Sequence, residues 1–524
     1  MLSRVFPVAV GLTTVALVAG CAVGPDFERP AAPDAERYTR EPLGAGTASA
    51  PVASGQAQRF VNGLDISSQW WTAFRSPALN SLIERSIKAN PTLESTIAAL
   101  RVAQESARAQ EGKFFPLVQG NFNPTSQQVA QSVAASSPLP SGALNFNLYT
   151  AQVLVSYTFD VWGLNRRTVE SLQAQADSQH FLVEAAYLTL AANVAAGAIQ
   201  EASLRAQIAT TLELININTK MLTILRQQLA TGQASRIDVA AQEAALAQVV
   251  ATLPPLRKAL LQQRDLLAAL AGRFPSEEPP EKFTLAHLHL TRDLPVTVPS
   301  RLIEQRPDVR SAEELLHSSA ALVGVSIANI LPSFTINATG GYVGTQLAGL
   351  ASPENQFWTV SGNVTQTLFD AGALLHEKRA AEAAYDSAAA AYRAAVIAAL
   401  QNVADTLRAI QQDALALKAA VDFERAAKIS LDLVTQQMLT GYANILLLLN
   451  AQQAYLQARL TVIQAQAARL ADTVALFQAL GGGWWNRPPD SPTQPVWTGS
   501  DQQPIGTFAP GQPAQRPPPP SGPP

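Results

Sequence analysis

The sequence predicts a mainly α-helical fold in which long helical hairpins continue from a few membrane-length β-strands. Three observations support this prediction. The stretch Leu164–Ala230 reads as helix for 67 residues without a break. Four runs of alternating or β-branched residues interrupt the helical sequence, and the chain passes through the same order of elements twice. We therefore expect an internal two-fold repeat.

The chain begins with a signal peptide, residues 1–20, in which Arg4 precedes the apolar run Val5–Val18. That run is too short to span a bilayer. Cys21 follows it and is the only cysteine in the sequence. One thiol excludes an internal disulfide and a cage of thiolates around a metal, so it needs another use. The alternative is a small buried cysteine within an ordinary signal sequence.

The residues before the cysteine, Leu17–Gly20, resemble the lipobox of bacterial lipoproteins. This resemblance implies that the sulfur of Cys21 is acylated and that the chain is cut before it. Position 22 is alanine and not the aspartate typical of inner-membrane retention, which favours the outer membrane. Residues 21–68 are then a lipid-anchored N-terminal linker.

Composition narrows the functional classes. The formal net charge is −3 and charged residues make up 15% of the chain, against roughly 25% in soluble globular proteins. This balance excludes a nucleic-acid surface. No segment after the signal peptide offers about 18 consecutive apolar residues, so a membrane role needs strands or a lipid. The C-terminal residues 486–524 are rich in proline and are expected to be a disordered tail.

The first repeat, residues 69–293, is expected to run helix, two strands, long helix, turn and returning helix. Its strands are predicted at about 117–128 and 148–160, and its turn near Gly232. A glycine there supplies the left-handed conformation that ends a long helix. Pro254-Pro255 interrupts the returning helix, and we expect a kink or a break because proline removes a backbone donor and clashes with the preceding turn.

The second repeat, residues 294–485, follows the same plan. Its strands are predicted at about 333–345 and 356–369, and its turn near Gly441. A 67-residue helix is a rod of about 100 Å. Because this is three times the hydrocarbon core of a bilayer, the rods must extend into water.

The four strands indicate that the protein is embedded in the outer membrane. Each has the length that a tilted strand needs to cross an outer membrane. Four strands do not close into a barrel, and open edges in lipid cost several kcal/mol for each unpaired backbone group. The chain is therefore expected to complete a barrel with copies of itself. The alternative is a soluble four-stranded sheet.

With these elements, the sequence resembles the TolC-like outer-membrane factors, and within them the lipoproteins of resistance-nodulation-division efflux pumps (NodT type). The resemblance extends from Cys21 to about Trp485. Its most specific passages are CAVGPDFERP (21–30), QWWTAFRSPALNSLI (69–83), LPVTVPSRLIEQRPDVRSAE (294–313) and TGYANILLLLNAQQ (440–453).

The resemblance implies a homotrimer in which three sets of four strands make a twelve-stranded barrel that continues as a helical tunnel. It also implies partners: outer-membrane lipid, a periplasmic adaptor and an inner-membrane pump. The tunnel would conduct drugs or other small molecules to the exterior. Two alternatives stay open: the exit duct of a type I secretion system, which shares this fold, and a lipid-anchored coiled-coil lipoprotein that is not a channel.

Two groups of site residues follow from the resemblance. The turns farthest from the membrane resemble the tips that meet the adaptor, and the start of the last long helix resembles the gate. Many members of this family have a sequence similar to LLDAQR at the gate. This chain instead has asparagine, Asn450, where that motif has its aspartate, and glutamine, Gln453, where it has its arginine. The tip residues are Thr231, Gly232, Ser235, Arg236, Thr440, Gly441 and Asn444, and the gate residues are Leu446, Asn450 and Gln453.

Signatures of catalysis are missing from the sequence. His287 and His289 flank a leucine without a third metal ligand nearby, and no zinc-protease, nucleophile-elbow or phosphate-loop motif occurs. We therefore expect neither an enzyme nor a metal site, and no cofactor apart from the covalent lipid on Cys21.

Overall fold

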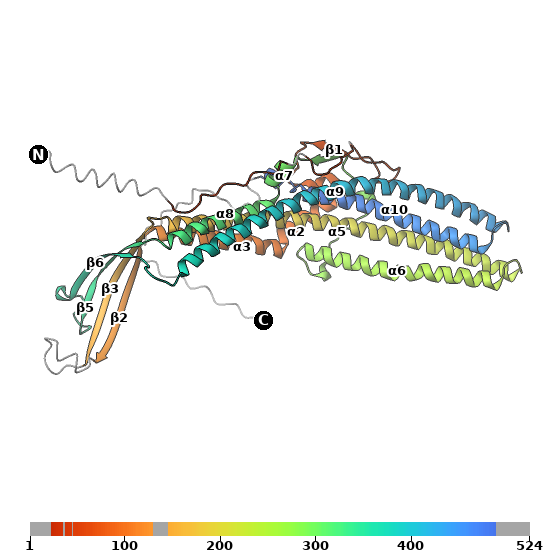
Figure 1. The fold of residues 1–524 in the computed structure, drawn as a ribbon. Helices are drawn as coiled ribbons and strands as arrows, with labels where there is room; N and C mark the ends of the chain where they lie inside the picture. The colour runs from red at the N-terminus through yellow and green to blue at the C-terminus, as the bar shows by residue number, and fades with distance from the viewer. Residues whose placement is uncertain (1–21, 35–36, 45, 129–144, 489–524) are drawn as a thin grey trace, which may run out of the picture. The chain divides into compact units, whose positions relative to one another are not determined.

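The computed structural model describes residues 22–34, 37–44, 46–128 and 145–488. Residues up to Asn486 make up one unit (Figure 1). The predicted signal peptide, Cys21 and all of the predicted tail beyond residue 488 lie outside the described residues.

Four antiparallel strands form one sheet in the order β2-β3-β5-β6. Their bounds are β2 (Leu117–Gln128), β3 (Asn145–Phe159), β5 (Ser333–Gly344) and β6 (Gln356–Thr365). The last strand is shorter than the predicted 356–369, because the chain leaves the ladder after Thr365: the Gln366 side chain donates to the carbonyl of Ile330 at 2.8 Å. Among the described residues, β2 and β6 each pair on one side only.

Two helical hairpins of matching lengths follow the strands. The first consists of α5 (Leu164–Ala230) and α6 (Arg236–Leu270), with 67 and 35 residues. The second consists of α9 (Ala373–Leu439) and α10 (Ile445–Ala479), again with 67 and 35 residues. Figure 1 shows the sheet at one end of these helices and both hairpin turns at the other.

An aspartate starts each long helix. The Asp160 carboxylate accepts the backbone N–H groups of Asn165 and Arg166 at 2.8 and 2.9 Å. The Asp370 carboxylate accepts those of Gly372 and Leu374, both at 2.9 Å, and these bonds lower the pKa of Asp370. Because a negative charge stabilises a helix N-terminus, both aspartates turn the chain from strand to helix at once.

Of the kink or break expected at Pro254-Pro255, the break does not occur. Helix α6 runs through both prolines without interruption. The two missing N–H groups leave the carbonyls of Val250 and Ala251 without their helical partners. Both residues are exposed, so the lost hydrogen bonds cost less than in a buried helix. Leu253, next to the prolines, is buried and keeps the helix packed.

Shorter elements surround the hairpins near the sheet and at mid-length. They are α2 (Pro77–Ala89), α3 (Pro91–Glu111), α7 (Pro299–Gln305) and α8 (Pro307–Ala328), with a parallel pair of short strands, β1 (Arg59–Asn62) and β4 (Asp293–Val296). Helix α3 packs on α5, and α8 packs on both α5 and α9.

The core is divided along the helices. The largest cluster surrounds Trp70, Trp71 and Phe74 and includes residues of α2, α5, α8, α9 and α10. A second cluster near the turns draws on all four hairpin helices. Among the described residues, one helix, α5, has a stretch long and apolar enough to cross a membrane, and 61% of that stretch is buried within the structure.

Candidate functional site

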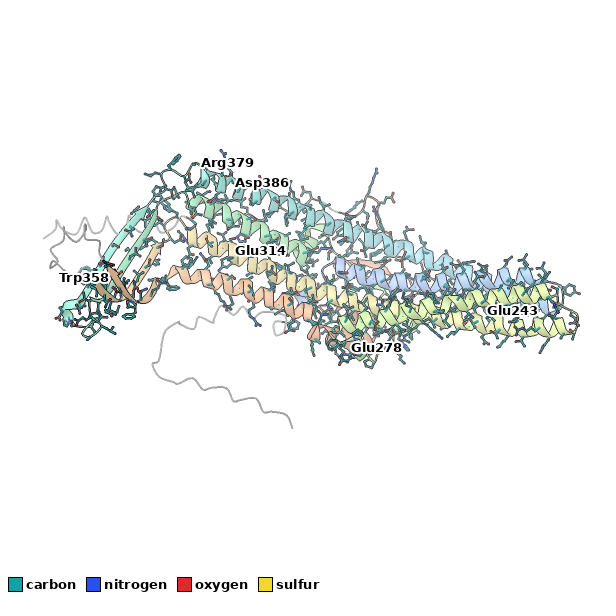
Figure 2. All side chains as sticks on the ribbon, turned by 90° about the horizontal axis from the view of Figure 1, so that it is seen from below. Glu243, Glu278, Glu314, Trp358, Arg379 and Asp386 are labelled. Carbon is teal, nitrogen blue, oxygen red and sulfur yellow. The ribbon has the colours of Figure 1, made fainter. Side chains whose placement is uncertain are left out.

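The sheet has one apolar face. Paired positions carry apolar side chains on the same side across all four strands, because the register aligns Phe122 with Ala151, Val155 with Ala338, and Ala338 with Val360. The largest of these side chains are exposed: Trp358 on β6 is 76% exposed and lies opposite Gly340. Figure 2 shows Trp358 on the sheet, away from the helices. An exposed apolar face of this size marks a surface that meets lipid or another chain.

The opposite face of the sheet is polar. Alternate positions carry Gln119 and Asn121 on β2 and Thr359 and Asn363 on β6. Hydroxyl and amide groups meet across β3 and β5, where Ser156 donates to Asn337 at 2.8 Å. Alternation of this kind, apolar on one side and polar on the other, is the pattern of a strand between lipid and a water-filled lumen.

The first hairpin turn contains the predicted residues Thr231–Arg236. Gly232 has φ +76°, and it ends α5 in the left-handed conformation that the sequence indicated. Ser235 and Asp238 form a reciprocal capping box at the start of α6. Arg236 is exposed, and its side chain contacts no partner among the described residues. Among the described residues, the turn is therefore a capped structure that exposes the Arg236 guanidinium.

The second turn has the same construction. Gly441 has φ +80°, and the Asn444 side chain accepts the Leu447 N–H at 2.9 Å to cap α10. Thr440 donates to the carbonyl of Gln436 at 3.1 Å. Two exposed apolar residues were not among the predicted tip residues. Tyr442 in this turn is 87% exposed, and Ile237, beside the first turn, is 79% exposed. The available signal was an apolar residue among polar ones, in the turn for Tyr442 and in the first turn of α6 for Ile237.

The three predicted gate residues lie together on one exposed face of α10. Leu446, Asn450 and Gln453 are separated by four and three residues, which places them on one side of a helix. The neighbouring Leu448 and Ala451 are buried in the cluster near the turns. The face beside the turn thus carries no charge at these positions and is available to other chains.

The residues that follow Cys21 are bound to the junction of sheet and helices. We call Ala22–Arg29 the anchor segment. Its Val23 N–H donates to the carbonyl of Trp162, just after β3, at 2.9 Å. The buried guanidinium of Arg167 donates to the Val23 carbonyl at 3.2 Å and to Asp26 at 2.6 Å.

Close backbone packing fixes the same segment. A Cβ on Gly24 would lie 2.4 Å from the Cα of Gly324 on α8, and Gly24 has φ +97°. Glycine at both positions is therefore required for the anchor segment to lie against α8.

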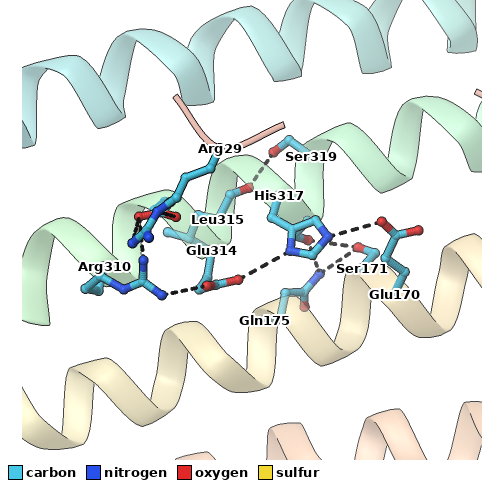
Figure 3. Close-up of polar contacts among 11 residues, drawn as sticks. Arg29, Glu170, Ser171, Gln175, Arg310, Glu314, Leu315, His317 and Ser319 are labelled. Atoms are coloured by element: carbon cyan, nitrogen blue, oxygen red, sulfur yellow. Dashed lines mark hydrogen bonds and ion pairs between the residues drawn. The ribbon is translucent and has the colours of Figure 1, made fainter. Parts of the chain in front are cut away.

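A polar network continues from the anchor segment across α5 and α8 (Figure 3). Phe27 stacks on the His317 ring at 4.4 Å, and the two nitrogens of that ring lie 3.1 Å from Glu170 and 3.4 Å from Glu314. Arg29 pairs at 2.6 Å with Glu313, whose side chain is 4% exposed. Burial raises the pKa of both Glu313 and Glu314.

Candidate metal sites are not found in the part of the chain that the structure describes. No group of three His, Cys, Asp or Glu side chains there is arranged to hold a metal. The predicted pair His287 and His289 is not brought to a third ligand: the His287 ring instead lies 3.0 Å from the hydroxyl of Thr284.

A sheet with one apolar and one polar face that continues into long hairpins defines a class, the outer-membrane channels that extend into the periplasm. The chain belongs to the outer membrane efflux protein family, whose model matches residues 82–273 and 298–482. The resemblance noted in the sequence is thereby confirmed.

Two curated relatives cover nearly the whole chain. The pyoverdine export outer membrane protein OpmQ of Pseudomonas putida is 28% identical over 462 residues, which are 85% of this chain and 94% of the relative. The probable efflux pump outer membrane protein TtgC of the same species is 25% identical over 475 residues, which are 90% of this chain and 95% of the relative.

Two solved structures of outer-membrane proteins have the same fold as this chain. The outer-membrane channel OprN superposes with a TM-score of 0.78 at 25% identity, covering 88% of this chain and all of that chain. VceC of Vibrio cholerae superposes with a TM-score of 0.74 at 26% identity, covering 80% and 99%. The chain is an outer-membrane exit channel of a tripartite efflux system and not an enzyme, which confirms both predictions.

Proposed function

We propose that three copies of the chain join their sheets into one twelve-stranded barrel and their hairpins into one tunnel. The observation that carries this proposal is the sheet itself, which has a lipid-type face, a lumen-type face and an open edge at β2 and at β6. Open edges in a bilayer leave backbone groups unpaired at several kcal/mol each. Pairing β6 of one copy with β2 of the next removes both edges.

Purified chain in detergent is expected to be a trimer with a small single-channel conductance, because the tunnel rests closed at the turns. Light scattering with detergent correction gives the mass, and planar-bilayer recording gives the conductance. A monomer that keeps its full strand content would contradict the proposal, since four strands cannot close alone.

The two turns are proposed to meet the helical hairpins of a periplasmic adaptor, which links the channel to an inner-membrane pump of the resistance-nodulation-division class. Both turns are rigidly capped, and they expose Arg236, Ile237 and Tyr442. Rigid turns with apolar and charged side chains suit a docking surface, because little conformational entropy is lost on binding. Relatives in Pseudomonas putida are named for the export or efflux of pyoverdine, toluene, solvents and antibiotics. The proposed substrates are accordingly small molecules.

The gate is proposed to be a constriction made by Leu446, Asn450 and Gln453 of three chains. All three are exposed on one face of α10 beside the turn, as a lumen-facing ring requires. Amide groups hydrogen-bond across an axis at about 1 kcal/mol per bond, and they carry no charge that titrates. We therefore propose closure by packing and hydrogen bonds.

Cys21 is proposed to carry the lipid. The support from the structure is the anchor segment, which holds the next residue, Ala22, against Gly163 at the junction of sheet and helices. A lipid attached one residue before this point enters the bilayer beside the barrel. Acyl chains add about 0.8 kcal/mol of membrane affinity per buried CH₂, in addition to the barrel.

Replacing Cys21 by alanine is expected to abolish incorporation of radiolabelled palmitate and to leave part of the trimer in the outer membrane, because the barrel is itself embedded. Gly324→Val is the control: it disturbs the seat of the anchor segment but leaves the lipobox intact, so labelling should persist. Undiminished labelling of Cys21→Ala would refute the assignment.

A further inference from the structure

A groove leads from the junction of sheet and helices onto the apolar face of the sheet. Its first part is a cavity of about 330 Å³ where the ends of β3, α5 and α8 meet. Its second part is a hollow of about 380 Å³ on the sheet itself. Phe159 and Val161 line both parts, so the two adjoin. Each part has the size of a small-ligand site, for which about 300–1,000 Å³ is usual.

The hollow lies on the apolar face, at the end of the sheet nearest the helices. Phe159 pairs with Phe334, and Phe334 pairs with Val364, in the last part of each ladder. Ile336 lies two residues further along β5, on the same face, and is paired with Gly362. A Cβ on Gly362 would meet no atom within 4 Å. The missing side chain therefore leaves the hollow open between larger apolar residues.

The walls of the junction cavity suit the boundary between lipid and water. The Trp162 indole N–H donates to the carbonyl of Pro332 at 2.8 Å, and the residue lines the cavity together with Leu164. Lys113, at the same cavity, is exposed and pairs with no carboxylate among the described residues. Tryptophan and lysine side chains concentrate where a membrane protein meets the lipid headgroups. The hollow then lies on the hydrocarbon side of the cavity.

The start of the anchor segment lies beside this groove. A Cβ on Gly163 would be 2.6 Å from the Cβ of Ala22, and the Val23 N–H donates to the carbonyl of Trp162 at 2.9 Å. Gly163 directly follows Trp162, which lines the cavity. Consecutive Cα atoms are about 3.8 Å apart. A lipid on the residue before Ala22 therefore starts within one residue of the groove.

We propose that the groove binds one acyl chain of the lipid on Cys21 and holds it against β5 and β6. This inference rests on the proposed acylation of Cys21. Hydrocarbon in the groove covers apolar side chains that would otherwise contact water. A tethered chain enters the groove without losing the translational freedom that a free lipid gives up, so it is favoured over ordinary membrane lipid as the occupant.

An acyl chain in this position also contributes to the trimer. Gly362 and Val364 belong to β6, which is an edge strand of the sheet and is proposed to pair with β2 of the next copy. A chain held on β6 packs at the boundary between two copies and adds apolar contacts there. The lipid is then a structural component of the barrel as well as its anchor.

Photo-crosslinking from the lipid tests the proposal on the full-length chain in intact outer membranes. Cells that are fed a fatty acid with a diazirine near the end of its chain attach it to their lipoproteins. After irradiation and digestion, mass spectrometry identifies the peptides that are joined through the lipid to the peptide beginning at Cys21. Peptides that contain residues 334–336 and 362–364 should be cross-linked about tenfold more often than the rest of the apolar face, because the tether keeps the chain at the groove.

Gly362→Val fills the hollow without a clash and should lower these cross-links about tenfold, because the tethered chain then has no groove to enter. Acylation of Cys21 should stay unchanged. Gly362→Ala is the second variant and should give a smaller fall. Gly340→Val is the matched control: Gly340 lies on the same face and strand as Ile336, about 14 Å further from the helices. A Cβ on Gly340 would also meet no atom within 4 Å, and the residue lies outside the groove.

Three outcomes would overturn the proposal: cross-links spread evenly over the apolar face, a parent-like pattern in both Gly362 variants, or an equal fall in Gly340→Val. Groove peptides joined only to phospholipid would also overturn it, since ordinary membrane lipid would then be the occupant. Circular dichroism and the trimer mass check that each variant folds. A peptide beginning at Cys21 without an acyl group would overturn the acylation itself. That result is distinguishable from a wrong groove, in which Cys21 is acylated but its lipid is cross-linked elsewhere.

Discussion

Asn450→Asp is expected to give the channel a divalent-cation block and a pH dependence that the parent lacks. In the proposed trimer the change places three carboxylates around one axis. They repel one another by about 1 kcal/mol per pair at 4 Å in water and more in a narrow, less polar constriction. This repulsion raises the pKa of at least one of them, so the ring titrates between about pH 4 and pH 7. The parent ring of amides has nothing to titrate in that range.

Planar-bilayer recording of both proteins at pH 4 to 8, with and without millimolar Mg²⁺, measures this effect. Gln262→Glu adds the same type of charge at an exposed position of α6 far from the turn, and it should behave as the parent does. An Asn450→Asp channel that cannot be told from the parent would remove residue 450 from the gate.

Arg236→Glu is expected to lower efflux in cells by weakening adaptor binding about tenfold or more, because reversing an exposed charge at an interface costs at least about 1.4 kcal/mol. The trimer yield should not change, since Arg236 contacts no partner among the described residues. Antibiotic susceptibility measures efflux in cells, and an adaptor pull-down measures binding of the adaptor. Arg257→Glu, exposed on the same helix away from the turn, is the control.

The other turn residues are poorer probes of docking than the sequence implied. Ser235 and Asn444 are both N-caps, and replacing such a cap by alanine costs about 1 kcal/mol of helix stability. Changes there act on folding and docking together. A fall in trimer yield with Arg236→Glu would show that residue 236 also has a structural role and would contradict the docking assignment.

Local chemistry accounts for what the sequence predicted about the helices. The positions of Gly232 and Gly441 set the ends of α5 and α9, because only glycine adopts a positive φ without strain. The apolar and polar alternation of β2 and β6 was likewise readable, because strand side chains have a period of two. In contrast, β6 ends at Thr365 and not at 369, since a side-chain contact between Gln366 and Ile330 takes over from the ladder.

Pro254-Pro255 does not break α6, and the reason is tertiary. Proline breaks an isolated helix because it loses a backbone hydrogen bond. In α6 the residues that lose a backbone partner, Val250 and Ala251, are exposed, while Leu253 packs into the structure, and packing outweighs the local cost.

By itself, the sequence determined that this chain is built from two long hairpins and four strands, that it belongs with the outer-membrane channels, and that its predicted gate carries no charge. These conclusions rest on periodicity, on glycine and proline, and on residue types, which are properties of neighbours along the chain. Only the tertiary structure brought Arg469 of α10 to the backbone carbonyls of Ser54 and Gln56, and Phe27 onto His317. The members of each of these groups come from elements far apart in the sequence, and their chemistry depends on burial and distance, which no local pattern contains.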